Sequence, residues 1–405
     1  MSRTRPVNCI IPPYILEKLM ESEDSEVRRA ALDTLLTTAR LRGERAVRSA
    51  FTGPSAASPG NARRTVFDCE RSEFLPDAVL ARSEDGPESP DEAVNQAFEG
   101  LGLTRDFYQE VFQRNSIDDR GMRLNGFIHY GEKINNAFWD GQEMLFGDGD
   151  GIEFGILTGS LDVIGHELSH GVTEHTSNFE YHNQSGALNE SMSDVFGALV
   201  KQWSLKQTAG EADWLIGADI WTPGIKGDAL RSMKAPGTAY NNPLVGKDPQ
   251  PDRMSKFVHL PDTPRTDNGG VHFNSGIPNK AFFATAVGIG GFAWEASGRI
   301  WYEALKASSP RDTFQDFADT TFQKAGQLFG IGSPEQTAVL AGWQEVEIQI
   351  TGVPAGLARA RVFSGNGHGG TGREADLAAL TRQIGALSDR VTSLARDVAA
   401  LKGSR

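Results

Sequence analysis

Two histidines and two glutamates lie at spacings typical of a zinc site that keeps room for water. The segment 166–170 reads HELSH, and Glu190 follows twenty residues after its second histidine. Residues four apart on an α-helix differ by about 40° around its axis, so His166 and His170 can bind one ion. Together with Glu190 they make three protein ligands, which leaves the fourth position of a tetrahedral Zn²⁺ open. An open position is typical of a catalytic zinc.

The elements around the motif must bring these ligands together. The apolar pattern continues past His170 and predicts a helix, Gly186 predicts a turn, and a second helix is expected from Ala187, with Glu190 and Asp194 on one face. An H-E-x-x-H segment alone also arises by chance in helices. Here the motif, a third ligand and a second helix occur together, which favours a catalytic metal site.

Three blocks of the chain resemble the thermolysin-like metallopeptidases. They are segments 162–200, 135–139 (NNAFW) and 267–276 (DNGGVHFNSG), and the resemblance covers about residues 60 to 353. It implies a zinc endopeptidase of the α+β class, with an N-terminal α+β lobe and a C-terminal α-helical lobe. The zinc helix would lie at their junction and the active site in the cleft between them. We expect the lobes at 64–189 and 190–353.

Catalysis needs a proton acceptor beside the metal, because zinc acidifies water and polarises a peptide carbonyl. Glu167, next to the first ligand, fits this role as general base. The resemblance implies that His272 and Tyr181 stabilise the carbonyl oxygen as it gains charge. Outside their motifs these two would be ordinary core or surface residues. The resemblance also implies supporting roles for residues that hold His272 and the zinc histidines, namely Asp267, Asp194 and Asn189.

Substrate-binding residues are implied only by the resemblance. Asn136 and Ala137 match positions that pair with an extended substrate backbone, and Arg231 matches the arginine beside the pocket for the residue after the scissile bond. The apolar wall of that pocket matches Phe154, Val163 and Leu230. The implied preference is cleavage before a bulky hydrophobic residue. Plain core packing of the three apolar residues is the alternative.

Composition agrees with a soluble enzyme. The 405 residues, 39% of them hydrophobic, are enough for two domains with a substantial core. The net charge of −13 argues against nucleic acid or an anionic membrane as a partner and leaves a protein or peptide substrate. No apolar run approaches the ~18 residues of a transmembrane helix.

Residues 1–50 are predicted to form an inhibitory propeptide, followed by a linker at 51–63. Segment 11–14 (IPPY) resembles the short propeptide of protealysin-type members of the family. We expect Pro12 and Pro13 to form a stiff extended strand in the cleft, and residues 25–42 to form an amphipathic helix. A disordered N-terminal arm is the alternative.

The two cysteines, Cys9 and Cys69, do not make a disulfide framework. Because a thiolate is a good zinc ligand, Cys9 is a candidate fourth ligand that caps zinc in the precursor, and an idle free cysteine is the alternative. The N-terminus lacks the uninterrupted apolar core of a signal peptide. This favours secretion by a non-classical route, with retention in the cytoplasm as the alternative.

One departure from the family concerns calcium. Thermolysin binds a calcium pair through an acidic cluster, and the matching positions here include Lys201, Leu215 and Ala218 in addition to Asp162 and Asp213. A lysine repels Ca²⁺ and can pair with the two carboxylates, so we expect no double-calcium site. A second family calcium loop matches Thr222, Ile225 and Asp228, which leaves room there for a single ion.

The tail differs from the catalytic part. A Gly-rich linker is expected at 354–373 and a coiled-coil helix at 374–402, with Leu377, Ile384, Val391 and Val398 at a positions and Leu380, Leu387, Leu394 and Leu401 at d positions. This pattern favours a parallel dimer and leaves a trimer or a singly docked helix open. It raises a second hypothesis, a zinc-bound oligomeric scaffold or a peptidase directed to a single substrate. A pure scaffold would not require Glu167 and His272.

Overall fold

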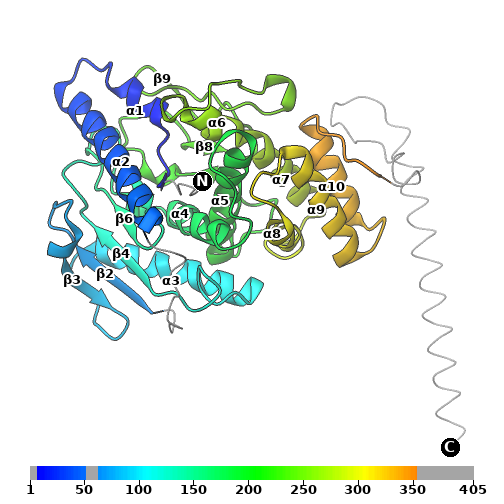
Figure 1. The fold of residues 1–405 in the computed structure, drawn as a ribbon, viewed down its shortest axis with the longest axis horizontal. Helices are drawn as coiled ribbons and strands as arrows, with labels where there is room; N and C mark the ends of the chain where they lie inside the picture. Colours follow the sequence, from blue (N-terminus) through cyan, green and yellow to red (C-terminus); the bar gives the residue numbers. More distant parts are fainter. Residues whose placement is uncertain (1–6, 52–62, 354–405) are drawn as a thin grey trace, which may run out of the picture. The chain divides into compact units, whose positions relative to one another are not determined.

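The computed structural model describes residues 7–51 and 63–353. In these ranges a sheet with its covering helix α3 forms one part of the fold, and a group of helices forms the other (Figure 1). Two long helices, α4 and α5, run between the two parts. No helix among the described residues is both long and apolar enough to span a membrane. The predicted tail segments 354–373 and 374–402 lie outside the described ranges, as does nearly all of the linker 51–63.

The sheet has six strands in the order β1-β5-β6-β4-β2-β3. Its centre is parallel, with β4 between β2 and β6, and the remaining neighbours are antiparallel. The strands are β1 (Asn8–Cys9), β2 (Arg64–Asp68), β3 (Val79–Ser83), β4 (Leu124–Ile128), β5 (Ala137–Trp139) and β6 (Met144–Phe146). Helix α3 (Glu92–Phe112) packs on β2 and β4, and Asp91 caps its N-terminus by accepting the Ala93 N–H.

The central helices α4 (Leu161–Glu174) and α5 (Asn183–Leu205) pack closely along their length. A Cβ on Gly197 would lie 2.5 Å from the Asp162 carbonyl oxygen, so only glycine allows this approach of the two backbones. The approach brings the histidines of α4 next to Glu190 of α5.

The prediction that Gly186 forms a turn was wrong, because α5 already begins at Asn183. A Cβ on Gly186 would lie 2.5 Å from Val271 Cγ1 and 2.9 Å from the Tyr181 carbonyl carbon. The glycine therefore permits close packing inside a helix. The expected lobe boundary at 189/190 falls within this same continuous helix.

The C-terminal part is mainly helical around a core that includes the stacked rings of Trp301 and Trp343. Its helices are α6 (Asp267–Asn274), α7 (Gly276–Ile289), α8 (Ala296–Ala307), α9 (Phe314–Phe329) and α10 (Pro334–Glu345). Its short strands are β7 (Leu215–Ile216), β8 (Arg231–Ser232), β9 (Asn241–Asn242) and β10 (Gly246–Lys247). Single turns of 3₁₀-helix in the two parts are η1 (Leu75–Asp77), η2 (Leu157–Gly159), η3 (Ala218–Ile220), η4 (Met254–Lys256) and η5 (Pro264–Thr266).

The N-terminal segment forms β1 and two helices, α1 (Pro13–Leu19) and α2 (Ser25–Phe51), drawn in blue in Figure 1. Helix α2 continues past the expected end at residue 42. The prediction of an extended Pro12-Pro13 strand was wrong for Pro13, which is the first residue of α1, whereas Pro12, its N-cap, does have an extended backbone. Proline fits the first helical turn because it needs no N–H partner there. The extended part lies earlier, at β1, which adds to the sheet beside β5.

Candidate active site

Three buried side chains from α4 and α5 converge on one point. His166 Nε2 lies 3.0 Å from His170 Nε2 and 3.5 Å from Glu190 Oε2, and His170 Nε2 lies 3.6 Å from Glu190 Oε1. A tetrahedral zinc ion with bonds of ~2.0–2.2 Å separates its ligand atoms by ~3.3–3.6 Å. The spacing of the three side chains therefore suits one zinc ion.

The hydrogen bonds of the two histidines also point to a cation. His166 Nδ1 lies 2.8 Å from Asp194 Oδ1, and His170 Nδ1 lies 2.7 Å from Asn189 Oδ1. With Nδ1 donating to these oxygens, each Nε2 turns a lone pair toward the other ring. Burial and the neighbouring His166 lower the pKa of His170, which keeps that ring neutral. Two facing lone pairs in a buried site repel each other unless a cation lies between them.

Glu167 lies beside this triad and is fully buried. Its Oε2 accepts the Trp139 N–H at 3.1 Å, while Oε1 has no hydrogen-bond partner within the described ranges. Burial and the charge of Glu190 raise the pKa of Glu167. A raised pKa makes a carboxylate a better proton acceptor, and a nearby divalent cation would act in the opposite direction.

His272 reaches the site from a sharply turned segment at the start of α6. Asp267, Asn268, Gly269 and Gly270 all have left-handed backbone conformations, which Asp, Asn and Gly tolerate best. The turn brings Asp267 back to accept both the His272 backbone N–H (2.7 Å) and Nδ1 (2.6 Å). Burial lowers the pKa of His272, but the charges of Asp267 and Glu190 outweigh it and raise the pKa to about 8.

Tyr181 joins the same group from the loop before α5. Its hydroxyl donates to Glu190 Oε1 and lies 3.4 Å from His272 Nε2. His272 Nε2 is in turn 3.3 Å from Glu190 Oε2. The hydroxyl and the imidazole thus border the third ligand from one side.

Arg231 and Asp194 form a buried pair behind the zinc histidines. The guanidinium donates from Nε and Nη2 to Asp194 at 2.8–3.1 Å, and Asn279 donates to the same carboxylate at 2.8 Å. Burial alone would raise the pKa of Asp194, but Arg231 and His166 hold it well below its usual value. Asn279, on α7, was missed at the sequence level because no local motif marks it.

The N-terminal segment lies along the cleft in the manner of a bound peptide. The Cys9 carbonyl is 3.2 Å from His272 Nε2, and Arg231 Nη1 donates to the Ile10 carbonyl at 3.0 Å. Asn136 pairs with both backbone groups of Ile11, accepting its N–H at 2.9 Å and donating to its carbonyl at 3.2 Å.

The candidate pocket residues are buried, as this segment is. Ala137 follows Asn136 on β5 and is fully buried. Ile10 belongs to the same buried apolar cluster as Phe154, Val163 and Leu230. Membership in one continuous core is compatible with both a pocket wall and plain packing.

The Cys9 side chain turns away from the triad. Its thiol contacts the Ile11 carbonyl at 3.8 Å and packs with Phe138 and Leu145 in a second apolar cluster. Burial raises the pKa of the Cys9 thiol to about 12. Within the described ranges, the residues able to share an ion at this point are His166, His170 and Glu190, and Cys9 does not join them. It is the carbonyl of Cys9 that faces the site.

At the positions of the family's calcium pair, Lys201 lies among carboxylates. Its Nζ is 3.2 Å from Asp162 Oδ2 and 3.5 Å from Asp213 Oδ2, as expected from the sequence, and 4.0 Å from Asp219 Oδ2, an additional partner. Burial lowers the pKa of Lys201, but these carboxylates outweigh it and raise the pKa.

The second candidate calcium loop contains Thr222, Ile225 and Asp228. The Ile225 N–H donates to the Thr222 carbonyl at 3.1 Å, and the Asp228 N–H donates to the Ala239 carbonyl at 2.8 Å. The Asp228 side chain is exposed.

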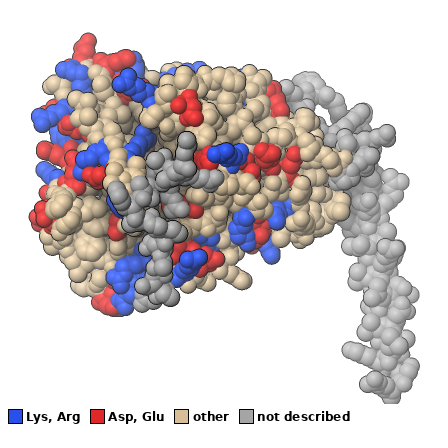
Figure 2. Space-filling view, in the orientation of Figure 1, with Lys and Arg blue, Asp and Glu red and all other residues tan. Residues whose placement is uncertain are grey.

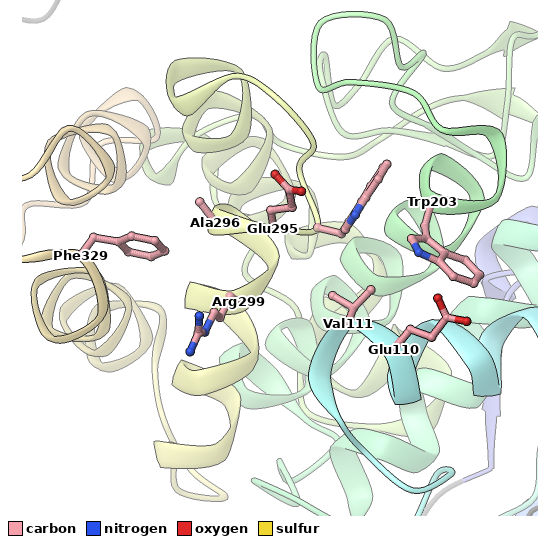
Figure 3. Close-up of a pocket in the computed structure, with 8 residues that line it drawn as sticks. Glu110, Val111, Trp203, Glu295, Ala296, Arg299 and Phe329 are labelled. Atoms are coloured by element: carbon pink, nitrogen blue, oxygen red, sulfur yellow. The ribbon is translucent and has the colours of Figure 1, made fainter.

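Two surface features lie apart from this site. A hollow of about 550 Å³ opens among α3, α5, α8 and α9 (Figure 3), and none of the sequence-predicted site residues lines it; its walls are Glu110, Val111, Trp203, Trp294, Glu295, Ala296, Arg299 and Phe329. On the face seen in Figure 2, the acidic and basic side chains of the described residues are interspersed.

Comparison with known families agrees with the geometry. Residues 65–174 match the model of the thermolysin metallopeptidase catalytic domain, and residues 177–348 match that of its alpha-helical domain. The chain belongs to the thermolysin metallopeptidase family. As a member of this family it is a metalloendopeptidase that uses a catalytic zinc, for which His166, His170 and Glu190 form the buried binding triad.

Relatives share nearly the whole described part of the chain. An extracellular metalloprotease of Pectobacterium carotovorum is 45% identical over 351 residues, which cover 86% of this chain and 98% of the relative. A bacillolysin of Bacillus cereus is 39% identical over 320 residues, covering 76% and 54%. The solved precursor of protealysin from Serratia proteamaculans is 45% identical with a TM-score of 0.75, and the match covers 86% of this chain and all of that one.

Proposed function

We propose that this chain is the self-inhibited precursor of a neutral zinc endopeptidase that cleaves peptide bonds before bulky hydrophobic residues. One observation carries the proposal. Asn8 and Cys9 pair with β5, and the backbone of residues 9–11 contacts His272, Arg231 and Asn136, the residues implied to bind substrate and stabilise its carbonyl.

The chemistry follows from the buried groups. Zinc bound by the triad supplies a Lewis acid that polarises a substrate carbonyl and acidifies water. The Oε1 atom of Glu167, which has no other partner among the described residues, accepts the proton of the attacking water. As the peptide bond breaks, the same carboxyl passes this proton to the leaving nitrogen.

Charge that develops on the carbonyl oxygen needs donors placed in advance. His272 Nε2 is such a donor, because Asp267 fixes the ring through Nδ1 and favours its protonated form. Tyr181 supplies a second donor from the neighbouring position. Both are positioned in the precursor, so removal of the N-terminal segment need not rebuild them.

Inhibition follows from the register of the N-terminal segment. In the proposed register the Cys9–Ile10 peptide bond corresponds to the scissile bond and Ile10 to the residue that enters the apolar pocket, and the contacts of His272 with the Cys9 carbonyl and of Arg231 with the Ile10 carbonyl support this register. Arg231 and Asn136 would then bind the two residues that follow the scissile bond of a substrate. An isoleucine at this place supports the preference for a hydrophobic residue after the bond.

The proposal also covers the export of the protein and the role of its C-terminal tail. Names of relatives such as the extracellular metalloprotease support export of this chain, and we favour a non-classical route over retention in the cytoplasm. We also retain self-association through the predicted coil at 374–402 as a proposal. The alternative, a zinc-bound scaffold or a peptidase for one substrate, is disfavoured in its scaffold form by the preserved Glu167 and His272.

A single experiment tests the enzyme and the precursor together. Purified full-length protein is incubated with unfolded casein, with and without a zinc chelator, and the new N-termini of casein and enzyme are sequenced. We expect chelator-sensitive cleavage before hydrophobic residues, with activity rising as the N-terminal segment is lost. Full activity with residues 1–50 still attached would contradict self-inhibition, and absence of any cleavage after their removal would support the scaffold.

A further inference from the structure

We infer that the mature enzyme has a binding site for a basic substrate side chain on the N-terminal side of the scissile bond. In the precursor this site is filled by Arg45 of helix α2. The inference rests on the proposed function, because Arg45 belongs to the segment that must leave the cleft.

The Arg45 guanidinium is enclosed by the catalytic part of the chain. Its Nη1 donates to the Trp139 carbonyl at 3.2 Å, and its Nη2 forms an ion pair with Glu174. The side chains of Arg45 and Glu174 are only 5% and 10% exposed. Such burial distinguishes the pair from the exposed ion pairs that contribute little to binding.

A flat surface completes the site. Gly141 has a φ of +99°, and a Cβ built on it would lie 2.7 Å from Arg45 Nη2 and 2.8 Å from Arg45 Cζ. The guanidinium therefore lies directly against the Gly141 backbone, and a side chain at residue 141 would require it to shift. A planar guanidinium suits this surface better than a tetrahedral ammonium.

The electrostatics of the site favour a cation. Glu174 is the last residue of α4, and the C-terminal end of a helix carries partial negative charge. Asp140, 2% exposed, lies next along the chain from Trp139 and is paired with Arg48 of α2 at 3.0 Å. When α2 leaves, two carboxylates and a carbonyl lose these contacts with arginines at the same edge of the cleft.

The position relative to the scissile bond follows from the register of β1. Ile11 lies at Asn136, Cys9 pairs with Phe138, and Asn8 pairs with Trp139. Moving along β5 from Asn136 to Trp139 therefore leads from the residues after the bond to those before it. Since Arg45 binds the Trp139 carbonyl, its site borders substrate residues that precede the scissile bond.

The test compares peptides on the mature enzyme, obtained by processing the full chain. Each peptide carries isoleucine after the scissile bond and has arginine, lysine or citrulline at the second, third or fourth position before it. Citrulline keeps the shape of arginine without its charge. At one position we expect kcat/KM to be about tenfold higher for arginine than for citrulline, mainly through KM, with lysine between them. This ratio corresponds to about 1.4 kcal/mol.

Two variants test whether Glu174 causes the preference for arginine over citrulline. In Glu174→Gln the ratio of arginine to citrulline should fall toward one, whereas in Glu345→Gln it should persist. Glu345 is a matched control, because it is also the last residue of a helix and is paired with a cation, Lys280, at 3.4 Å. The peptide comparison on the unaltered enzyme stands even if Glu174→Gln does not fold.

The outcomes separate the two proposals. An enzyme that cleaves all peptides with a ratio near one at every position overturns this inference alone, and Arg45 is then only an anchor of the N-terminal segment. Failure to cleave any of the peptides, citrulline peptides included, contradicts the proposed cleavage before hydrophobic residues and this inference with it.

Discussion

Replacing Lys201 with alanine should destabilise the protein by about 2–3 kcal/mol. The Lys201 side chain is 15% exposed, and its ammonium lies beside Asp162, which is fully buried. Removing one partner of a buried ion pair typically costs about 3–5 kcal/mol, because the other charge is left without compensation. The lower value expected here reflects Asp213 and Asp219, whose side chains are 49% and 59% exposed and screened by water.

The assay is thermal unfolding of zinc-loaded protein, with Lys256→Ala as the matched control. Lys256 also pairs with an aspartate, Asp252, at 2.8 Å, but its side chain is 60% exposed. The control should therefore lose at most about 1 kcal/mol. Equal shifts in melting temperature for the two variants would refute the argument that burial makes the Lys201 cluster important.

The position of Lys201 also predicts how the melting temperature responds to calcium. Because Lys201 Nζ already lies among the three carboxylates, a calcium-selective chelator that leaves zinc bound should barely change the melting temperature. In Lys201→Asp, by contrast, added calcium should raise it. A large drop on chelation in the unaltered protein would show that another ion, for example in loop 222–228, is structurally important.

Four further outcomes are expected. Glu167→Gln should keep zinc by metal analysis while losing at least about 10²–10⁴-fold in peptidase rate, and loss of the metal would show that the carboxylate is not the base. Cys9→Ser precursor should be as latent as the parent, since the carbonyl of residue 9 faces the site; faster maturation would reinstate the thiol as a zinc cap. A hydrogen bond to Asp148, then one to Asp91, raises the pKa of His129 to about 9, so this stabilisation is complete below about pH 6.5 and lost as pH rises through 9. His129→Gln should accordingly lower the melting temperature at pH 6 and not at pH 10; an equal loss at both would contradict the charge argument. Truncation after Gly372 should turn a dimer into a monomer by light scattering, and equal masses would leave the tail without a role in self-association.

The convergence of the candidate site residues could be predicted where each lies in a short segment whose local geometry is specific. Helical spacing alone brings His166 and His170 to one side of α4. The left-handed turn before His272 favours Asp, Asn and Gly, which are the residues found at 267–270. The sequence of this segment therefore determines its backbone conformation. Such segments specify where a side chain points without knowledge of distant contacts.

Other features depended on contacts that no local pattern records. Glycine is typical of turns, yet Gly186 lies inside α5 and allows this helix to pack closely against Val271 and Tyr181. Pro13 fits an extended strand and a first helical turn equally well, and the packing of α1 decides between them. Asn279 joins Asp194 from a distant part of the chain, so only the folded structure identifies it. Asp219 directly follows Ala218, but nothing in the local sequence marks it as a partner of Lys201.

Strand β5 connects the proposed substrate site with its proposed inhibition. An edge strand presents unpaired backbone groups, and an enzyme that binds extended peptides needs such an edge in its cleft. In the precursor, β1 covers this edge through main-chain pairing, while Asn136 and Arg231 hold the residues that follow. The same contacts would bind a substrate, so a change at Asn136 or Arg231 that weakens substrate binding should also weaken the hold on the N-terminal segment. Helix α2 adds contacts outside this register, such as Arg45 with Glu174, and these distinguish the inhibitor from a substrate that is cut and released.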